Sequence, residues 1–437
     1  MKPIKILFAT TPAAGHFNPL TGLAEYLAQR GNDVRWYTSS DFSRQITELS
    51  IHHYPFKAAL GINFENLDAF FPERVRIKNP TDRMNFDMIN LFANRSTEYF
   101  SDISEIFQKF KFDVLICDNT FSAIPIIRAK LNIPVVAIGV MPLPEISIDL
   151  GPYGLGLLPP LTVLGRLKNN IMRYLFKNLL AKKSISAFAN ILAPFQIPDT
   201  RLPLLDLLVK KSDLFLQIGT QSFEYPRSDL GKNIRFIGGL KQNAPKGSFE
   251  FWFDQRLTTF KKIILITQGT VEKNLNNLII PTIEAFKGGE NLLIVTTGGN
   301  QTETLQQRYK FENIIIEDFI PYKDIMPYAH VYVTNGGYGG VMQSLNYGLP
   351  IVAAGLFEGK NEICSRIGYF KVGINLKTET PSIQEIRTAV NKILTDTDIG
   401  NNAWLISNEL DKINSKELCY TYIKELLTAS DQNGPWI

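Results

Sequence analysis

Short apolar runs alternate with longer stretches of helical periodicity along most of the chain. In the first half, the strand-like runs and helical patterns are, in chain order, Ile4–Ala9, Pro19–Arg30, Asp33–Thr38, Val114–Cys117, Ser122–Leu131 and Pro134–Ile138. Continuous apolar runs are typical of strands buried on both faces, and alternation with helices is typical of parallel sheets. The pattern predicts a doubly wound α/β domain, which two further strand-like runs complete at Asp213–Ile218 and Asn233–Gly239.

A polar stretch with no clear period, Lys241–Glu250, separates this domain from a second one of the same kind. Its predicted strands and helices are Ile263–Thr267, Leu275–Phe286, Leu292–Thr296, Ile314–Glu317, Val331–Thr334, Val341–Tyr347 and Ile351–Ala354. From Ser382 onward the pattern predicts only helices, at Ile383–Leu394, Trp404–Ile413 and Lys416–Leu427. We expect a first domain in residues 1–240, a linker in 241–258, a second domain in 259–404, and C-terminal helices in 405–437 that cross back to the first domain.

Composition narrows the class of protein. The 437 residues are 45% hydrophobic and 20% charged, which is enough apolar material for two cores and excludes a disordered chain. The formal net charge of +4 is small for this length, so we expect no nucleic-acid partner. Prolines interrupt the most apolar long stretch, 136–167, so we expect no membrane-spanning helix. The N-terminus has no secretion-signal pattern and the three cysteines form no CxxC pair, so we expect a cytoplasmic protein without disulfides or a zinc site.

Two titratable side chains are predicted at the carboxyl ends of strands in the first domain. His16 lies in the turn Thr11–Pro19 after the first strand, and Asp118 follows the strand Val114–Cys117. Ligands of open α/β sheets bind at such ends. An aspartate that accepts from one imidazole nitrogen leaves the other free to take a proton, so the pair is a candidate general base. The alternatives are that His16 is structural or merely exposed, and that Asp118 caps a helix starting near Ser122.

Two glycine-containing turns follow strands of the second domain. Thr334–Gly340 opens a helix, and Gln268–Thr270 follows the domain's first strand. Glycine lets an anion approach the backbone closely, and a helix start presents free N–H groups and the positive end of the helix dipole. The turns therefore predict a phosphate site, with Asn335 and Tyr338 as further hydrogen-bond donors. The alternative is that both are only tight strand-to-helix connections.

In this order, the motifs resemble those of nucleotide-sugar-dependent glycosyltransferases of the GT-B fold, specifically the UDP-glycosyltransferase and macrolide-glycosyltransferase group (glycosyltransferase family 1). The resemblance covers nearly the whole chain and rests on Gly15–Leu20, Arg30–Val34, Asp118, Gln268–Thr270 and Phe319–Pro350. It implies two Rossmann-like domains facing across a cleft, the first binding the acceptor and the second the nucleotide sugar. It implies that His16 is the catalytic base and Asp118 its partner. The donor-binding residues that it implies are Gly15, Gly269, Thr270, Phe319, Ile320, Tyr322, Asn335, Gly336, Gly337, Tyr338, Gly339, Gly340 and Gln343.

Three positions depart from the family pattern, which usually has His, Ser and an acid where this chain has Asn335, Gly340 and Gln343. Asn335 can still donate to a phosphate and Gly340 keeps its backbone N–H, so we still expect diphosphate binding. An amide at 343 has one acceptor group where a carboxylate could accept from both ribose hydroxyls, so the nucleoside does not follow from the sequence. The usual Asp-Gln pair is also missing. The residues in its place, one or more of which we expect to contact the sugar or diphosphate, are Glu358, Lys360 and Asn361.

The leading hypothesis is an inverting, metal-independent glycosyltransferase. It would move a sugar from a nucleotide diphosphate, with UDP favoured and dTDP possible, to a hydroxyl of a small hydrophobic acceptor. Two alternatives stay open: a nucleotide-sugar-binding protein without transferase activity, and a nucleotide-sugar epimerase. We expect no cofactor and no metal besides the nucleotide-sugar co-substrate, and we interpret the acid-x-acid pattern Asp396–Asp398 as helix capping.

The stretch Arg166–Lys183 interleaves basic and apolar residues at helical spacing. Such a pattern is typical of a helix that touches a membrane surface or an apolar acceptor, and we expect peripheral membrane contact at most. The interpretation that we favour is an amphipathic helix that covers the acceptor domain.

Overall fold

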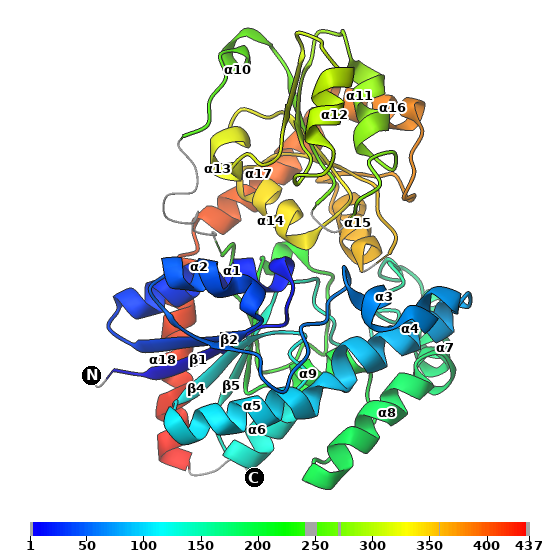
Figure 1. Cartoon of the computed structure of the whole chain (residues 1–437). Coiled ribbons are helices and arrows are strands. Elements are labelled where there is room, and N and C mark those ends of the chain that lie inside the picture. Colours follow the sequence, from blue (N-terminus) through cyan, green and yellow to red (C-terminus); the bar gives the residue numbers. More distant parts are fainter. Residues whose placement is uncertain (1–2, 241–250, 270–271, 358, 434–437) are drawn as a thin grey trace.

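The computed structural model describes residues 3–240, 251–269, 272–357 and 359–433. Within these ranges, two parallel sheets each form the centre of one half of the molecule (Figure 1). The first has the order β3-β2-β1-β4-β5-β6-β7, and the second has the order β10-β9-β8-β11-β12-β13. The strands are β1 (Lys5–Ala9), β2 (Asp33–Thr38), β3 (His52–Pro55), β4 (Val114–Asp118), β5 (Val135–Gly139), β6 (Leu214–Gln217), β7 (Ile234–Phe236), β8 (Ile263–Thr267), β9 (Leu292–Thr296), β10 (Ile314–Glu317), β11 (Val331–Thr334), β12 (Ile351–Ala353) and β13 (Gly373–Asn375).

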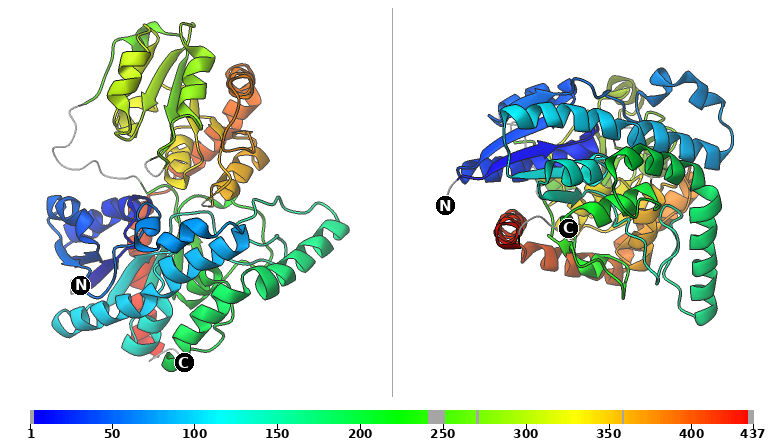
Figure 2. Two further views of the ribbon diagram at one scale, coloured as in Figure 1. Left: turned by 45° about the vertical axis from the view of Figure 1, so that its right-hand side comes forward. Right: turned by 90° about the horizontal axis from the view of Figure 1, so that it is seen from below.

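Helices connect the strands and cover the sheets (Figures 1 and 2). Those of the first half are α1 (Ala14–Gln29), α2 (Ser43–Glu48), α3 (Leu67–Phe70), α4 (Pro80–Asp87), α5 (Arg95–Lys109), α6 (Ile124–Leu131), α7 (Val163–Leu175), α8 (Lys182–Leu192) and α9 (Leu204–Lys211). Those of the second half and the tail are α10 (Arg256–Thr259), α11 (Ile279–Phe286), α12 (Thr302–Arg308), α13 (Tyr322–Ile325), α14 (Tyr338–Asn346), α15 (Lys360–Tyr369), α16 (Ile383–Thr395), α17 (Thr397–Asp411) and α18 (Ser415–Asn433).

The central strands match the sequence prediction because they are buried along their whole length. Every residue of β4, β5, β8 and β9 is buried, so each appears in the sequence as a continuous apolar run. The edge strands β3 and β13 were not predicted. Both are short and partly exposed, so neither carries such a run.

Both sheets have a switch point where the chain order reverses. β1 lies between β2 and β4, with Ala9 opposite Cys117, and β8 lies between β9 and β11, with Thr267 opposite Thr334. In doubly wound sheets the connections leave β1 and β4 towards opposite faces, which opens a crevice at their carboxyl ends. The fold therefore provides one ligand-binding position in each half.

The tail returns to the first half. α17 lies beside α14, whereas α18, drawn in red in Figure 1, runs along the first half and packs against α1. Glu417 of α18 accepts hydrogen bonds from Arg30 and from the hydroxyl of Tyr26. The helix predicted at Trp404–Ile413 is the second part of α17. Asp396 caps α17 by accepting from the backbone N–H of Asp398 at 3.1 Å, as the capping interpretation requires.

The basic stretch forms α7 and a following π-helical turn, Phe176–Leu180. The expectation that it covers the first domain is wrong for α7, since most of its apolar side chains are exposed and its one buried residue is Asn169. α8 instead buries Ile185, Phe188 and Leu192, as a covering helix should. Among the described residues, no helix is both long enough and apolar enough to cross a bilayer.

Candidate active site

His16 and Asp118 are brought together by neighbouring strands. Asp118 is the last residue of β4, and His16 lies in the first turn of α1, which follows β1. The imidazole Nδ1 lies 2.8 Å from Oδ1 of Asp118. The carboxylate is fully buried, whereas 22% of the imidazole side chain is exposed. The helix was expected to start only at Pro19. It starts at Ala14 and contains Pro19, so His16 is held by a helix rather than by a loose turn.

Asp118 is held by more than the histidine. Its Oδ2 accepts from the backbone N–H of Thr11 at 2.8 Å, and its Oδ1 accepts from the backbone N–H of Thr120 at 2.9 Å. Burial by itself would raise the pKa of Asp118, but the charge of His16 and the hydrogen bonds from His16, Thr120 and Thr11 together lower it below its ordinary value. A carboxylate only accepts, so Nδ1 carries the proton of the neutral imidazole and Nε2 is left as the basic nitrogen.

The capping alternative for Asp118 is wrong. The following helix, α6, starts at Ile124 rather than near Ser122, and its N-cap, Ala123, has no side chain that could cap it. Asp118 bonds instead to the turn after β1, to Thr120 and to His16. Its interactions therefore serve the strand-end site and not the helix.

The two glycine turns of the second half lie side by side and have the same local geometry. Gly269 follows β8 with a φ of +75°, and Gly336 follows β11 with a φ of +84°. The backbone N–H of each donates to the hydroxyl of the threonine that ends the strand, Thr267 or Thr334. The side-chain amide of Asn335 donates to the carbonyl of Gln268 at 2.5 Å, so it ties one turn to the other.

α14 starts directly after the second turn. Its N-cap is Gly337, which has no side chain to occupy the free N–H groups of the first turn. Outside its chain neighbours and its own helix backbone, no atom lies within 4 Å of the position that a Cβ at Gly339 would take, so the backbone there is open. At Gly340 a Cβ would lie 2.6 Å from the hydroxyl of Tyr332, which therefore occupies the space that a serine side chain would need.

The start of α14 also contacts the first half. The Tyr338 hydroxyl donates to the carbonyl of Ile218 and accepts from Gln217 at 3.0 Å, so it is not free to donate to a phosphate in this arrangement. Gln343 and Gly339 line a cavity of about 20 Å³ between the halves, together with Pro19 of α1. The carboxyl ends of the two sheets therefore face each other, with α1 and α14 on the facing sides (Figure 1).

The remaining predicted donor residues have different surroundings. Phe319 is half exposed after β10, whereas Ile320 is buried, and Tyr322 lies 3.3 Å from Tyr332, hydroxyl to hydroxyl. Asn361, at the start of α15, donates to the carbonyl of Gly154 of the first half at 2.6 Å. Gly15 and Lys360 lie in the first turns of α1 and α15. Thr270 and Glu358 lie outside the described residues.

A sequence model of the family described as "UDP-glucoronosyl and UDP-glucosyl transferase" matches residues 101–412. The chain belongs to this family. It is a nucleotide-sugar-dependent glycosyltransferase. The two alternatives, a nucleotide-sugar-binding protein without transferase activity and a nucleotide-sugar epimerase, are therefore set aside.

Individual relatives and solved structures match nearly the whole chain. The 4'-demethylrebeccamycin synthase of Lentzea aerocolonigenes is 30% identical over 392 residues, which cover 89% of this chain and 91% of that one. UDP-glycosyltransferase 2 of Phaeomoniella chlamydospora is 28% identical over 97% of this chain and 96% of that one. The solved structure of the calicheamicin glycosyltransferase CalG4 has a TM-score of 0.74 at 17% identity and covers 98% and 99% of the two chains. The two sheets therefore form the GT-B fold.

Sequence reasoning missed a buried ion network that joins the halves of this glycosyltransferase. Arg366 of α15 donates to Glu224 of the first half at 2.6 Å and to Glu362 at 3.0 Å. Glu362 also accepts from the backbone N–H groups of Gly154 and Gly156. Arginine and glutamate usually lie at the surface, so the isolated sequence carried no signal for this contact.

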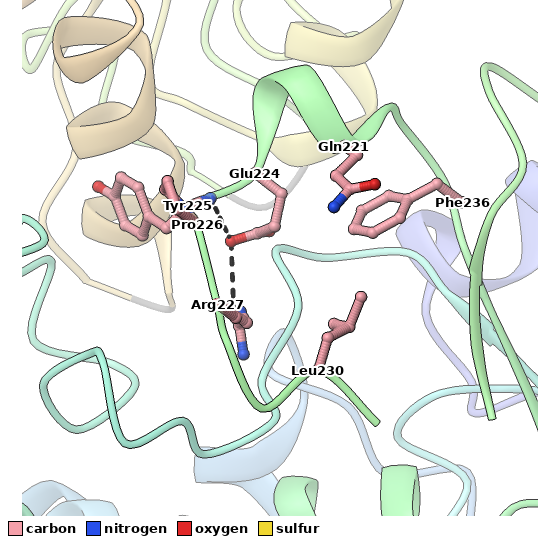
Figure 3. Close-up of a pocket in the computed structure, with 7 residues that line it drawn as sticks. All are labelled: Gln221, Glu224, Tyr225, Pro226, Arg227, Leu230 and Phe236. Atoms are coloured by element: carbon pink, nitrogen blue, oxygen red, sulfur yellow. Dashed lines mark hydrogen bonds and ion pairs between the residues drawn. The ribbon is translucent and has the colours of Figure 1, made fainter. Parts of the chain in front are cut away.

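A cavity of about 250 Å³ lies beside this network (Figure 3). Glu224 lies in its wall, within hydrogen-bond distance of Arg227 and of the backbone N–H of Tyr225. Burial would raise the pKa of Glu224, but Arg366 and Arg227 lower it below its ordinary value. None of the predicted site residues lines this cavity, so it is separate from the strand-end sites.

Proposed function

We propose that this glycosyltransferase inverts the sugar it transfers, with His16 as the general base and Asp118 as its partner. The acceptor that we propose is a small hydrophobic molecule with a free hydroxyl, and the donor is a UDP-sugar or, as the less favoured option, a dTDP-sugar. The observation that carries the proposal is the bond between His16 and the buried Asp118 at the strand end of one half, opposite the open helix start of the other.

The proposed reaction is a single displacement. Nε2 of His16 takes the proton of the acceptor hydroxyl, and the negative charge of Asp118 stabilises the imidazolium that forms. The acceptor oxygen bonds to the anomeric carbon from the face opposite the diphosphate while the bond from that carbon to the diphosphate oxygen breaks. The configuration therefore inverts, and the nucleoside diphosphate leaves with the electron pair.

We propose that backbone groups, rather than a divalent ion, take up the leaving-group charge. The free N–H groups at the start of α14 and the positive end of its dipole are suited to a diphosphate. The open backbone at Gly339 supports this role, because a Cβ added there would meet no atom within 4 Å outside its chain neighbours and its own helix backbone. Phe319, half exposed beyond β10, is the proposed stacking surface for the nucleobase.

The proposed acceptor class follows from two of the similar proteins. The names of 4'-demethylrebeccamycin synthase and of the calicheamicin glycosyltransferase refer to natural products, and we extend that acceptor class to this chain as a proposal. The test is a mass-spectrometric screen of UDP- and dTDP-sugars against phenolic, terpenoid and macrolide acceptors. A product with one added sugar, opposite in anomeric configuration to the donor and formed equally with and without a chelator, supports the proposal. A retained configuration or a strict metal requirement contradicts it.

A further inference from the structure

α7 has its apolar side on the outside of the molecule. Leu164, Leu167, Ile171 and Tyr174 follow one another at spacings of three and four residues, which places them on one face of the helix. All four are exposed, Leu164 to 78% and Tyr174 to 67%. Leu161, just before the helix, is 93% exposed.

The side of α7 that faces the protein is polar. Asn169 is its buried residue, and Arg173 donates to the carbonyl of Leu150 in the preceding loop and to the side chain of Asn170. Figure 2 shows α7 at the periphery, away from both sheets. The distribution is thus the reverse of that in α8, whose apolar side chains are buried. An amphipathic helix in this orientation does not pack its apolar face against the core of its own domain, so that face is open to an external partner.

The charged residues on α7 and the turn that follows it are all basic, whereas Asp149 lies near Arg166 and Arg173, and Asp229 lies near Arg173. Residues 150–198 contain six basic residues and no acidic residue. Three of the basic side chains, Arg166, Lys168 and Lys177, are exposed along α7 and the turn that follows it. A helix with an apolar face and basic flanks is suited to the interface of a bilayer that carries negative charge.

We propose that α7 docks the protein peripherally on anionic lipid bilayers. The apolar face defined by Leu164, Leu167, Ile171 and Tyr174 enters the acyl boundary, while the basic side chains contact the headgroups. A second copy of the chain fits this face less well, because pairing two such helices would bring like charges together. The proposal does not depend on the identity of the transferred sugar or of the acceptor.

The test is co-sedimentation of the full chain with vesicles of phosphatidylcholine alone and of phosphatidylcholine mixed with phosphatidylglycerol. We expect binding to the mixed vesicles that weakens with added salt, and little binding to the neutral ones. The triple variant Leu164→Ser, Leu167→Ser and Ile171→Ser should lose about tenfold in partitioning for each side chain. Its matched control replaces three exposed apolar residues elsewhere, Ile383, Trp404 and Leu405, and should bind like the wild type.

A charge variant provides an independent measurement if the serine variant is unstable. Reversal of Arg166, Lys168 and Lys177 to glutamate should reduce binding by at least about a hundredfold, since each basic side chain near an anionic surface contributes about a factor of five. The control reverses three other exposed lysines, at 130, 261 and 310, and should change binding little. Transfer to a water-soluble acceptor should be unchanged in all four variants. The proposal is overturned if the wild type does not bind anionic vesicles, or if the serine variant and the charge-reversal variant both bind as strongly as their controls. It is also overturned if the wild type is a dimer and the serine variant is a monomer.

Discussion

Both halves of this glycosyltransferase have their candidate site at the same position of a doubly wound sheet. The first half uses side chains there, and the second uses the backbone. In the first half, the site beside β1 and β4 is made of side chains, an imidazole on a buried carboxylate. In the second half, the site beside β8 and β11 is made of backbone, with glycines where side chains would stand. In the proposed function, the first site transfers a proton, which needs a titratable group, and the second binds a diphosphate, which needs close access to N–H groups.

The two sites also differ in how they are kept in place. Asp118 is fixed by hydrogen bonds from three residues that converge on a buried charge, so its geometry depends on particular side chains. The glycine turns are fixed by positive φ angles and by strand-end threonines, so their geometry depends on the absence of side chains. Removal of a side chain should therefore damage the first site, and addition of a side chain at a glycine should damage the second.

The largest effect is expected from His16→Ala. Loss of the proposed general base should lower kcat/KM for sugar transfer by about 10²–10⁴-fold, while the affinity for UDP stays the same. The measurement is steady-state kinetics with the donor and acceptor found in the screen, beside calorimetric titration with UDP. The control is His52→Ala, which removes an exposed imidazole from the edge strand β3. Near-normal transfer by His16→Ala would remove the contrast between the two sites.

Gly336→Ala should mainly affect stability. The backbone at 336 has a φ of +84°, and a Cβ there would lie 2.5 Å from the sulfur of Cys364. We expect a loss of about 2 kcal/mol in the free energy of unfolding, from backbone strain and this contact. Urea unfolding measures it. Gly337→Ala is the matched control, because a Cβ at 337 would meet no atom within 4 Å, and equal stability of the two variants would contradict the argument.

Gly339→Ala separates ligand binding from folding. Because the space beside Gly339 is open, the variant should fold normally or be slightly more stable, since alanine favours a helix over glycine. If the diphosphate lies against this backbone, the added methyl should weaken UDP binding by about tenfold, the equivalent of one lost charge-assisted hydrogen bond. Gly400→Ala in α17 has the same open surroundings and should leave UDP binding unchanged. Unchanged binding in Gly339→Ala would place the diphosphate elsewhere.

The smallest effect is expected on the free energy of unfolding at acidic pH. Asp118 and Glu224 both have a pKa below the ordinary value in the folded protein, so the unfolded chain binds more protons as the pH falls. The stability that they contribute is fully present above the pKa of an unfolded carboxyl, about 4, and is lost as the pH falls through the lowered values. Urea unfolding at neutral pH and below about pH 4 measures this loss, which should be smaller in Asp118→Asn. A loss as large in Asp118→Asn as in the wild type would show that the first site contributes none of it.

Much of this architecture follows from the sequence because it depends on local pattern. Buried central strands require apolar runs, and the glycine turns require glycine, so both can be recognised in one chain. The position of His16 and Asp118 after neighbouring strands was predicted for the same reason. The short edge strands β3 and β13 were not, because neither His52–Pro55 nor Gly373–Asn375 carries a continuous apolar run.

Contacts between distant segments could not be predicted. Nothing local to Tyr338 indicates that its hydroxyl bonds to Ile218, 120 residues earlier in the chain. Nothing local to Gly340 indicates that Tyr332 fills its place. The outward orientation of α7 also escaped prediction, because the periodicity of a helix reveals that it has an apolar face but not which way that face points.

The network of Arg366, Glu224 and Glu362 constrains how substrates can enter. These charges are buried between the halves, and separating the halves would break the Arg366–Glu224 pair, although Arg366 would keep Glu362 and Glu224 would keep Arg227. An opening motion that separates the halves evenly is therefore disfavoured. The halves should instead rotate about this contact as a pivot, so that the gap between α1 and α14 widens while the ion network stays closed.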